Sequence, residues 1–419
     1  MKCLVVVGAR PNFMKAAPIL KAIGEFNRSR AEWAEAIVPV LVHTGQHYDA
    51  QMSDAFFADL ELPRPDVFLG AGSGSHGEQT AEIMRRFEPV LVKDNPDALL
   101  VVGDVNSTLG CALVAAKLPS RAGSRPLIAH VEAGLRSLDR SMPEEINRIL
   151  TDQISDMLFV TEKSAIRNLR AEGVPQARVF FVGNTMIDSL REHECKAELS
   201  SVLDRIGIER GQYVLLTLHR AANVDDRESF LEIIAGLREL ANSHAIIFPA
   251  HPRTQKQIHE LGLDSYFRFS PSFENRKGAC PELAEGWGNR EKGIRMIDPQ
   301  GYLDFLCLMK SARLVVTDSG GIQEETTALG VPCVTVRDNT ERPVTIELGT
   351  NVLAGTRRET IQRAIQKQLA FRRQTQIPEL WDGRAGARIV GILADRLMTH
   401  APAMPKLQPG TGQIQENAR

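Results

Sequence analysis

The chain has 419 residues, of which 43% are hydrophobic and 24% are charged, with a formal net charge of −2. One hydrophobic core rarely organises a chain of this length, so two domains are expected. The near-neutral charge provides no global field for nucleic acid or an anionic membrane, and no apolar run is long enough to span a bilayer. The six cysteines form no CxxC pair and no zinc spacing. We therefore expect a soluble cytoplasmic protein without a metal site.

Short apolar runs alternate with helical periods from the first residues onward. Strand, glycine turn and helix in this order open a doubly wound α/β domain. In the first half of the chain we expect strands at 4–8, 37–43, 66–70, 98–102, 126–131, 157–160 and 179–182, separated by helices around 13–23, 50–60, 76–92 and 109–117.

Polar clusters follow four of these strands. They contain Arg10 with Lys15, Gln46 with His47, Asp104, and Glu132. Ligands bind outside the carboxyl ends of the strands in open α/β sheets, so we expect the clusters to converge. One such cluster is easily a turn, whereas four in register indicate a site.

A helix start follows the loop after Glu132. The segment Ser141–Glu145 places a serine before a proline and two glutamates, which is typical of a helix N-terminus with acids in its first turn. Glu144 therefore has two interpretations at this point, helix capping or a role in chemistry.

The segment 191–211 is charged and helical in pattern, and we interpret it as the connector and hinge between two domains. Beyond it, two strands end in His219 and His251. A histidine at a strand end can be structural, but two at matching ends favour positions that face a ligand. Strands of the second half are expected at 213–218, 245–250, 294–297, 312–316, 334–336 and 351–354.

The stretch Thr317–Glu325 joins a strand to a helix through Ser319, Gly320 and Gly321. Bare glycine backbone and the positive end of a helix dipole form an anion site that suits a diphosphate. The alternative is an ordinary corner in which Ser319 only caps the helix, and the turn alone does not decide between the two. The loop 337–343 that follows is dense in charge and can bind hydroxyls and phosphates.

These elements predict an α/β fold of two Rossmann-like doubly wound domains facing a cleft, the GT-B architecture. The N-terminal domain would span 1–190 and carry the acids, and the C-terminal domain would span 205–375 and bind the nucleotide. A C-terminal helix is expected at 380–400. The segment 275–292 is interpreted as a surface insertion without a function, and 401–419 as a disordered tail.

Six segments together resemble the non-hydrolysing UDP-N-acetylglucosamine 2-epimerases, in the same order and over about residues 1 to 355. They are GARPNFMK (8–15), GDVNST (103–108), HVEAGLRS (130–137), MPEEINR (142–148), TDSGGIQEE (317–325) and NTERP (339–343). The resemblance implies inversion at C2 of UDP-N-acetylglucosamine to give UDP-N-acetylmannosamine. It also implies elimination and re-addition of UDP through a 2-acetamidoglucal, with no cofactor or metal, in a homodimer.

Roles implied by the resemblance fall on matching positions. The implied catalytic residues are Lys15, Asp104, Glu132, Glu144 and His219. The implied residues that bind diphosphate, sugar, ribose or uracil are Arg10, Arg148, Gln300, Phe305, Ser319, Gly320, Gly321, Glu325 and Arg342, and His251 joins them from its strand-end position. Acids that share a site raise each other's pKa, which suits proton transfer, but the order of their steps stays open.

Two departures from the family pattern leave alternatives open. Many members carry His-Arg-Arg-Glu where this chain has His-Arg-Ala-Ala-Asn at 219–223. That segment and the loop of Gln46 and His47 are associated in bacterial members with a second, activating UDP-N-acetylglucosamine, so both residues are candidate regulatory positions. The insertion at 275–292 could accompany a modified substrate, such as a 2,3-diacetamido uronic acid. A GT-B glycosyltransferase and a non-catalytic nucleotide-sugar sensor are further alternatives.

Overall fold

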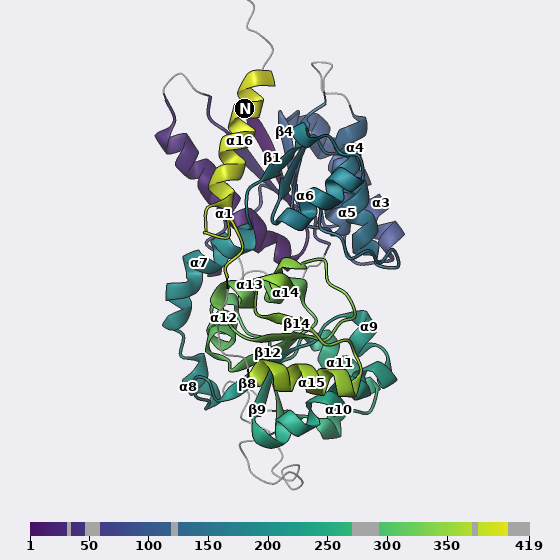
Figure 1. Ribbon diagram of the computed structural model, residues 1–419. Coiled ribbons are helices and arrows are strands. Elements are labelled where there is room, and N and C mark those ends of the chain that lie inside the picture. Colours follow the sequence, from purple (N-terminus) through teal and green to yellow (C-terminus); the bar gives the residue numbers. More distant parts are fainter. Residues whose placement is uncertain (32–34, 47–58, 119–124, 270–292, 371–375, 401–419) are drawn as a thin grey trace, which may run out of the picture.

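The computed structural model describes residues 1–31, 35–46, 59–118, 125–269, 293–370 and 376–400. Two lobes lie one above the other in Figure 1, and each is built on a seven-stranded parallel sheet. This architecture confirms the predicted α/β class of two Rossmann-like domains.

The N-terminal sheet has the strand order β3-β2-β1-β4-β5-β6-β7. The order reverses between β1 and β4, where doubly wound sheets place their ligands. Val5 of β1 lies opposite Leu41 of β2 and Leu100 of β4. The elements are β1 (Lys2–Val7), α1 (Arg10–Ser29), β2 (Val38–His43), β3 (Val67–Phe68), α3 (His76–Asp94), β4 (Ala98–Val102), α4 (Asn106–Lys117), β5 (Leu127–Val131), α5 (Pro143–Ile154), β6 (Met157–Val160), α6 (Lys163–Ala171) and β7 (Val179–Phe181).

The C-terminal sheet has the order β10-β11-β9-β8-β12-β13-β14 and reverses between β8 and β12. Val316 of β12 pairs with Leu216 of β8, and the two strands end together at Thr217 and Thr317, the edge at which a ligand is predicted to bind. The elements are β8 (Tyr213–Thr217), α9 (Ala221–Val224), α10 (Arg227–Ser243), β9 (Ala245–Pro249), α11 (Pro252–Glu260), β10 (Arg268–Phe269), β11 (Gly293–Ile297), α12 (Tyr302–Ser311), β12 (Leu314–Thr317), α13 (Gly320–Leu329), β13 (Cys333–Thr335), α14 (Val344–Glu347), β14 (Asn351–Leu353) and α15 (Arg358–Leu369).

Alternate residues of β1 pack into different cores because successive side chains of a strand point to opposite faces of the sheet. Cys3, Val5 and Val7 join one core, and Leu4 and Val6 join another. Both faces of the sheet are therefore covered, as a doubly wound fold requires. The first of these cores continues into α12 and β12 of the second lobe.

Two short helices connect the lobes, α7 (Thr185–Glu198) and α8 (Val202–Ile206). α7 packs against α1 of the N-terminal lobe and against α12 and α13 of the C-terminal lobe. The connector predicted at 191–211 is thus largely helical, and α7 bridges both lobes. Its role as a hinge stays a prediction.

The last described helix, α16 (Ala385–His400), returns to the first lobe. It packs along α1, and Figure 1 shows it in yellow beside that helix. The backbone N–H groups of Ala385 and Gly386 donate to the Asp188 carboxylate of α7, at 3.1 and 2.7 Å. The start of α16 therefore holds the connecting helix α7 against the N-terminal lobe.

The predicted elements and the observed ones differ mainly in length. β4 and β6 coincide with the predicted strands 98–102 and 157–160, whereas the strand predicted at 66–70 is reduced to Val67–Phe68. Most of the helix predicted at 50–60, all of the insertion at 275–292 and the tail at 401–419 lie outside the described residues. The boundaries at 1–190 and 205–375 stay predictions. Among the described helices, none is long and apolar enough to cross a membrane.

Candidate active site

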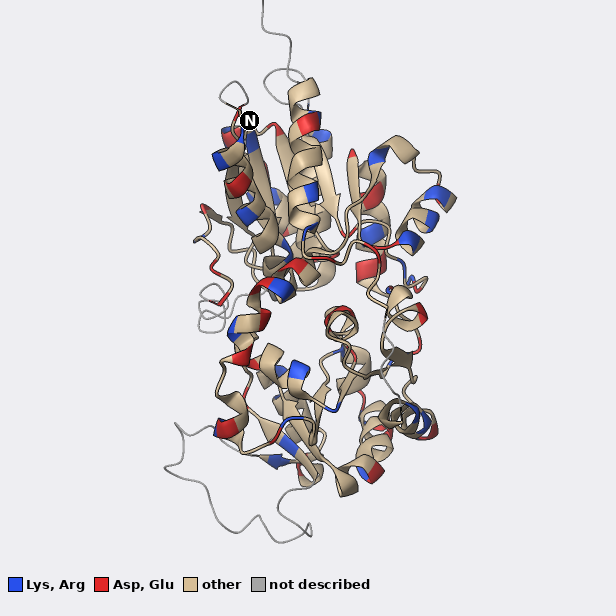
Figure 2. Cartoon of the chain, turned by 60° about the vertical axis from the view of Figure 1, so that its left-hand side comes forward, with Lys and Arg blue, Asp and Glu red and all other residues tan. Residues whose placement is uncertain are grey.

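Three charged residues meet where the lobes face each other. Lys15 lies on α1, Glu132 directly follows β5, and Arg342 lies in the loop between β13 and α14. Lys15 Nζ is 2.5 Å from Glu132 Oε2, and Arg342 Nη2 is 3.9 Å from the same oxygen. All three side chains are buried, and Figure 2 shows acidic and basic segments along this boundary. One carboxylate of the N-terminal lobe therefore faces a cation from each lobe.

Glu132 has an unusual backbone conformation. Its φ is +70°, a region that residues other than glycine rarely occupy. Its Oε1 is buried and has no hydrogen-bond partner among the described residues. Backbone strain and an unpaired buried oxygen both cost free energy, and strain of this kind clusters at functional sites. One oxygen of this carboxylate therefore has no protein partner and can contact a substrate.

Asp104 follows β4 and is half-buried. It forms an ion pair with Arg148 of α5, whose guanidinium also lies 2.6 Å from Glu145 Oε2. Burial alone would raise the pKa of Asp104, but the charges of Arg148, Lys15 and Arg342 outweigh burial and lower that pKa. Asp104 is therefore ionised at neutral pH.

The two acids at the start of α5 differ in their surroundings. Glu145 is buried and accepts hydrogen bonds from the backbone N–H groups of Ser137 and Leu138, at 3.0 and 2.9 Å. Glu145 therefore anchors the loop that precedes α5, and the N-cap residue Met142 makes no side-chain capping hydrogen bond. Glu144 is half-buried, and its charge acts on Arg220 of the opposite lobe. Glu144 thus faces the boundary between the lobes.

The glycine turn begins α13 at Gly320, with Ser319 as the residue that precedes the helix. The Ser319 side chain makes no capping hydrogen bond, so the first turn of α13 keeps its N–H groups available to a ligand. A Cβ on Gly320 would overlap the Arg342 guanidinium and would lie 2.8 Å from Glu341 Oε1. A Cβ on Gly321 would lie 3.2 Å from Met186 Cε. At Gly320 only bare backbone fits beside Arg342 as it stands, whereas at Gly321 a small shift of Met186 would make room, and the turn presents a helix N-terminus beside a buried arginine.

Arg342 is held by acids of its own lobe. Its Nη1 lies 2.5 Å from Glu341 Oε1, and its Nε lies 3.0 Å from Glu324 Oε1. Glu324 Oε1 also accepts a hydrogen bond at 3.0 Å from Asn184 Nδ2, at the start of α7. Burial and the charge of Glu132 raise the pKa of Glu324 to about 7, although Arg342 opposes them. Arg342 is thus aimed across the boundary by a partner on α13.

Glu325 is the next residue of α13 and is also buried. Burial, followed by the nearby charge of Glu324, raises the pKa of Glu325 to about 8. Its Oε1 has no hydrogen-bond partner in the described part of the chain. An unsatisfied carboxyl oxygen in this place can accept a hydrogen bond from a ligand hydroxyl.

His219 follows β8 and is tied to the neighbouring strand end. Its Nδ1 lies 2.8 Å from Asp318 Oδ1, and the same carboxylate accepts hydrogen bonds from the backbone N–H of Arg220 at 2.9 Å and from Asn223 Nδ2 at 3.1 Å. Burial would lower the pKa of His219, but the charge of Asp318 outweighs it and raises that pKa. The imidazole is exposed and is held by Asp318, so the ring borders the glycine turn in a fixed orientation.

Other predicted residues lie at the edges of this arrangement. His251 is exposed and caps the N-terminus of α11, where its Nδ1 accepts a hydrogen bond at 3.3 Å from the backbone N–H of Arg253. Gln300 donates to the Asp298 carbonyl at 2.7 Å, and Phe305 is half-buried against the central core. These contacts do not connect the three residues to the Glu132 cluster.

The candidate regulatory pair is only partly described. Gln46 is buried, and its Oε1 accepts hydrogen bonds from the Ser107 N–H at 3.0 Å and hydroxyl at 2.6 Å. Gln46 thereby supports the loop that carries Asp104. His47 lies outside the described residues, and the structure describes Arg10 only as the first residue of α1.

The sequence reasoning missed Asp318, and it noted Glu324, Arg337 and Glu341 only as members of charged segments, without a specific role in the site. Each lies within or beside a segment that was singled out, and Arg337 Nη2 donates to Glu341 Oε2 at 2.8 Å. Their closeness in sequence to predicted site residues could have pointed to them, because Asp318 and Glu324 flank the glycine turn and Glu341 precedes Arg342.

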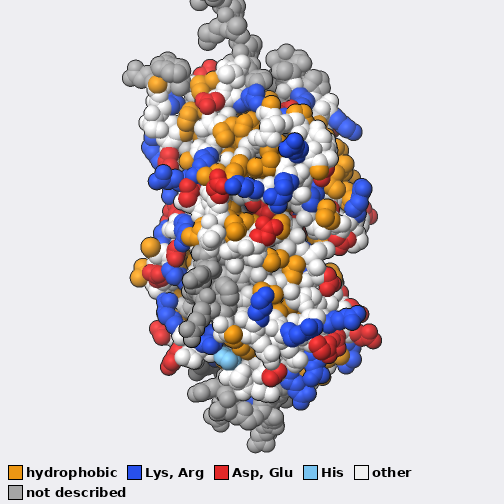
Figure 3. Space-filling view, viewed as in Figure 1, with side chains coloured by type: hydrophobic (Ala, Val, Ile, Leu, Met, Phe, Trp, Pro, Cys, Tyr) orange, Lys and Arg blue, Asp and Glu red, His pale blue; other side chains and the backbone are white. Residues whose placement is uncertain are grey.

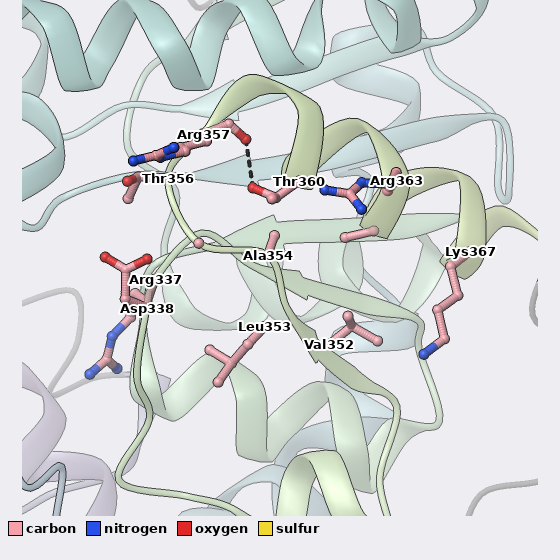
Figure 4. Close-up of a pocket in the computed structure, with 12 residues that line it drawn as sticks. Arg337, Asp338, Val352, Leu353, Ala354, Thr356, Arg357, Thr360, Arg363 and Lys367 are labelled. Carbon is pink, nitrogen blue, oxygen red and sulfur yellow. Dashed lines mark hydrogen bonds between the residues drawn. The ribbon is translucent and has the colours of Figure 1, made fainter.

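A surface groove of about 780 Å³ lies between the end of β14 and α15. Figure 4 shows Arg357, Arg363 and Lys367 around it, and Arg337 at one edge. None of the predicted site residues lines this groove. On the face shown in Figure 3, basic and acidic side chains are interspersed, consistent with the net charge of −2.

Two Rossmann-like lobes that face each other define the GT-B class of α/β proteins, and here acids of one lobe face the glycine turn of the other. A family model described as UDP-N-acetylglucosamine 2-epimerase matches residues 30–394. The chain belongs to the UDP-N-acetylglucosamine 2-epimerase family.

Individual relatives agree with this assignment. A UDP-N-acetylglucosamine 2-epimerase of Methanocaldococcus jannaschii is 42% identical over 399 residues, which cover 94% of this chain and 99% of that protein. A UDP-2,3-diacetamido-2,3-dideoxy-D-glucuronate 2-epimerase of Pseudomonas aeruginosa is 39% identical over 398 residues, which cover 94% of this chain and 99% of that protein. The crystal structure of the M. jannaschii enzyme in complex with UDP-GlcNAc and UDP is similar, with a TM-score of 0.80 and 41% identity, and covers 94% of this chain and 100% of that one.

Proposed function

We propose that this protein interconverts UDP-N-acetylglucosamine and UDP-N-acetylmannosamine by epimerisation at C2, without net hydrolysis. Family membership and the name of the relative that is 42% identical support the proposal. The observation that carries it is the approach of Arg342 of one lobe to Glu132 of the other, at 3.9 Å. A substrate between the lobes would meet acids at its sugar and a cation at its diphosphate.

The chemistry explains why both kinds of group are needed. The C2 proton of an intact sugar is not acidic, because no carbonyl group adjoins it. Loosening of the C1–O bond develops oxocarbenium character at C1 and lowers the cost of removing that proton. The departing UDP takes the electron pair of the C1–O bond, and its negative charge needs stabilisation by cations and N–H donors. Arg342 and the first turn of α13 supply both.

Proton transfer is assigned to the acids of the N-terminal lobe. One carboxylate takes the C2 proton while the C1–C2 double bond of the 2-acetamidoglucal forms. Return of a proton to the opposite face of C2, with UDP adding back to C1, gives the epimer. Asp104, Glu132 and Glu144 are the candidates, and two of them serving opposite faces would complete the inversion. Lys15 stabilises Glu132 as an anion.

Arg342 links binding to this chemistry in the proposed mechanism. Its guanidinium lies near Glu132 Oε2 and against the bare backbone of Gly320. A diphosphate at the turn offers Arg342 a doubly charged partner, which competes with Glu132. Binding of the substrate would therefore weaken one of the two cationic contacts of Glu132.

Incubation with UDP-N-acetylglucosamine in deuterated water tests the proposal. The expected result is a mixture of the two UDP-sugars with deuterium at C2. Accumulation of free N-acetylmannosamine and UDP would identify a hydrolysing enzyme instead. Exchange that depends on an added acceptor would favour a glycosyltransferase.

A second candidate substrate is UDP-2,3-diacetamido-2,3-dideoxy-D-glucuronate. It is favoured by the P. aeruginosa relative, which is 39% identical over 398 residues. Parallel assays with both UDP-sugars distinguish the candidates, because the preferred substrate should have the higher kcat/KM. The homodimer implied by the family resemblance stays a prediction, which sedimentation velocity would test.

A further inference from the structure

A fully buried histidine, His130, lies behind the acids without touching the boundary between the lobes. It belongs to β5 and precedes Glu132 by two positions. Its Nδ1 lies 2.7 Å from Asp152 Oδ1, and its Nε2 lies 2.8 Å from the carbonyl oxygen of Gly103. Asp104 directly follows Gly103, so the ring contacts the peptide next to one candidate catalytic acid and lies two residues before another, Glu132.

Both contacts of the ring are made to hydrogen-bond acceptors. A backbone carbonyl oxygen only accepts, so Nε2 must carry a proton to bond Gly103. An ionised Asp152 also only accepts, so Nδ1 must carry a proton too. Either neutral tautomer would turn one nitrogen lone pair toward an oxygen lone pair at 2.7 or 2.8 Å. The two distances are satisfied together only by an imidazolium ring or by a protonated Asp152.

The surroundings of Asp152 favour its ionised form. Its Oδ2 accepts a hydrogen bond from the Gly134 N–H at 3.0 Å and forms an ion pair with Arg136 Nη2 at 2.7 Å. Arg136 is shared with Glu172, whose Oε2 lies 2.6 Å from the same nitrogen. Glu172 itself is exposed, so solvent screens its charge, whereas Asp152 is fully buried. The Gly134 N–H and Arg136 both support an ionised Asp152, and its Oδ1 then requires a protonated Nδ1 on His130.

The Gly103 peptide is a point on which several site residues converge. Gly103 has a φ of +70°, and its N–H donates to the Val131 carbonyl at 3.0 Å. A Cβ at Gly103 would lie 3.1 Å from Lys15 Nζ and 3.9 Å from Glu132 Oε2. A rotation of this peptide would therefore displace Asp104 and disturb the contact between Lys15 and Glu132.

We propose that His130 is a buried imidazolium that positions the catalytic acids by holding the Gly103 carbonyl while Asp152 holds its other nitrogen. His130 is a positioning residue, because it acts through Gly103 and does not reach the substrate. The consequence for catalysis rests on the proposed epimerase function, whereas the protonation state of the ring does not.

Nitrogen NMR of the intact protein labelled at histidine tests the protonation state directly. At about pH 7.5, where a free histidine is mostly neutral, both nitrogens of His130 should show the signature of a protonated ring. The resonance is assigned by its absence from the spectrum of His130→Gln. A ring with one unprotonated nitrogen would overturn the proposal, whatever reaction the enzyme catalyses.

Two matched variants test the positioning role. Asparagine places an amide nitrogen near the position of Nδ1 and keeps a donor for Asp152, whereas glutamine places one near Nε2 and keeps a donor for Gly103. His130→Asn should lower kcat by about 10²-fold with little change in KM, because misplacing reacting groups by about 1 Å costs that much. His130→Gln should retain clearly more of the wild-type kcat.

The outcomes separate this proposal from the proposed function. Equal losses in the two variants, matched by equal losses of folded protein in thermal melts, would show a merely structural histidine. Wild-type kcat in His130→Asn would also overturn the positioning role. If the wild-type enzyme exchanges no C2 hydrogen while the ring is doubly protonated, the proposed epimerase function is refuted, whereas the proposed protonation state of His130 is supported.

Discussion

Arg342 Nη2 and Glu132 Oε2 lie 3.9 Å apart, although the two residues belong to different sheets. Lys15 contacts the same carboxylate oxygen from its own lobe, and Glu324 holds Arg342 from behind. This bridge joins the group that would bind a diphosphate to a group that would handle a proton. Its components make separate predictions.

Replacement of Arg342 by alanine should weaken the binding of UDP. A charge-assisted hydrogen bond contributes about 1.5–3 kcal/mol, so the Kd should rise by about 10- to 100-fold. Titration calorimetry with UDP measures the change. Arg363→Ala removes an exposed arginine from the groove beside α15 and is the matched control, which should bind UDP as the wild type does. Equal affinities for Arg342→Ala and the wild type would contradict the assignment.

Amide replacements of the acids should affect rate more than binding. Asp104→Asn, Glu132→Gln and Glu144→Gln should each lower kcat by about 10²–10⁴-fold, the range typical of acid–base catalysis, with UDP affinity largely kept. Steady-state kinetics together with UDP titrations measure both quantities. Glu88→Gln, an exposed position on α3, is the control and should leave kcat unchanged. Wild-type kcat in all three variants would remove the proposed site.

Gly320→Ala should abolish tight UDP binding, because the added methyl group overlaps the Arg342 guanidinium. The matched control is Gly391→Ala on α16, where a Cβ meets no atom within 4 Å. That control should be neutral or more stable by up to about 1 kcal/mol, since alanine favours a helix over glycine. If Gly320→Ala binds UDP normally while folding normally, the turn does not hold the diphosphate beside Arg342.

Glu325 should make the ligand-free protein less stable as pH rises. The pKa of Glu325 is raised to about 8 in the folded protein, above its ordinary value of 4.5. Between these two values the folded state binds more protons than the unfolded state, so the free energy of unfolding falls with rising pH and levels off above about pH 8. Glu325→Gln should flatten this slope and be the more stable protein at about pH 9.

Urea unfolding of both proteins over this pH range measures that difference. Glu324 titrates with a pKa of about 7 and adds a slope in the same window, so the comparison is between the two curves and not with a flat line. Curves that stay parallel from acidic to alkaline pH would mean that Glu325 is not protonated in the folded protein.

The sequence was sufficient for the fold because the relevant signals are local. β4 is a fully buried run of apolar residues, Ala98–Val102. A short continuous apolar run of this kind is typical of a parallel strand that is buried on both faces of the sheet. α13 ends at Gly330, whose φ of +67° suits only glycine at low cost. The glycine-rich corner and the strand-end clusters could be placed for the same reason.

The pairing of charges across the lobes could not be predicted from spacing. Glu144 and Glu145 are adjacent and chemically alike, and only the path of the loop decides that Glu145 bonds Ser137 and Leu138. The contact of Arg342 with Glu132 depends on how the two sheets are set by α7, which is a long-range property of packing. The predicted binding residues His251 and Gln300 follow strands, and each makes a hydrogen bond to nearby backbone.

The central claim is that acids of the N-terminal lobe act on a sugar whose diphosphate is held at Ser319–Gly321. Mass spectrometry of UDP-N-acetylglucosamine after incubation with the enzyme in deuterated water tests it most directly. We expect one deuterium at C2 in both UDP-sugars for the wild type, and its loss in Glu132→Gln although UDP still binds. Unlabelled substrate with the wild-type enzyme, or undiminished labelling with Glu132→Gln, would contradict the claim.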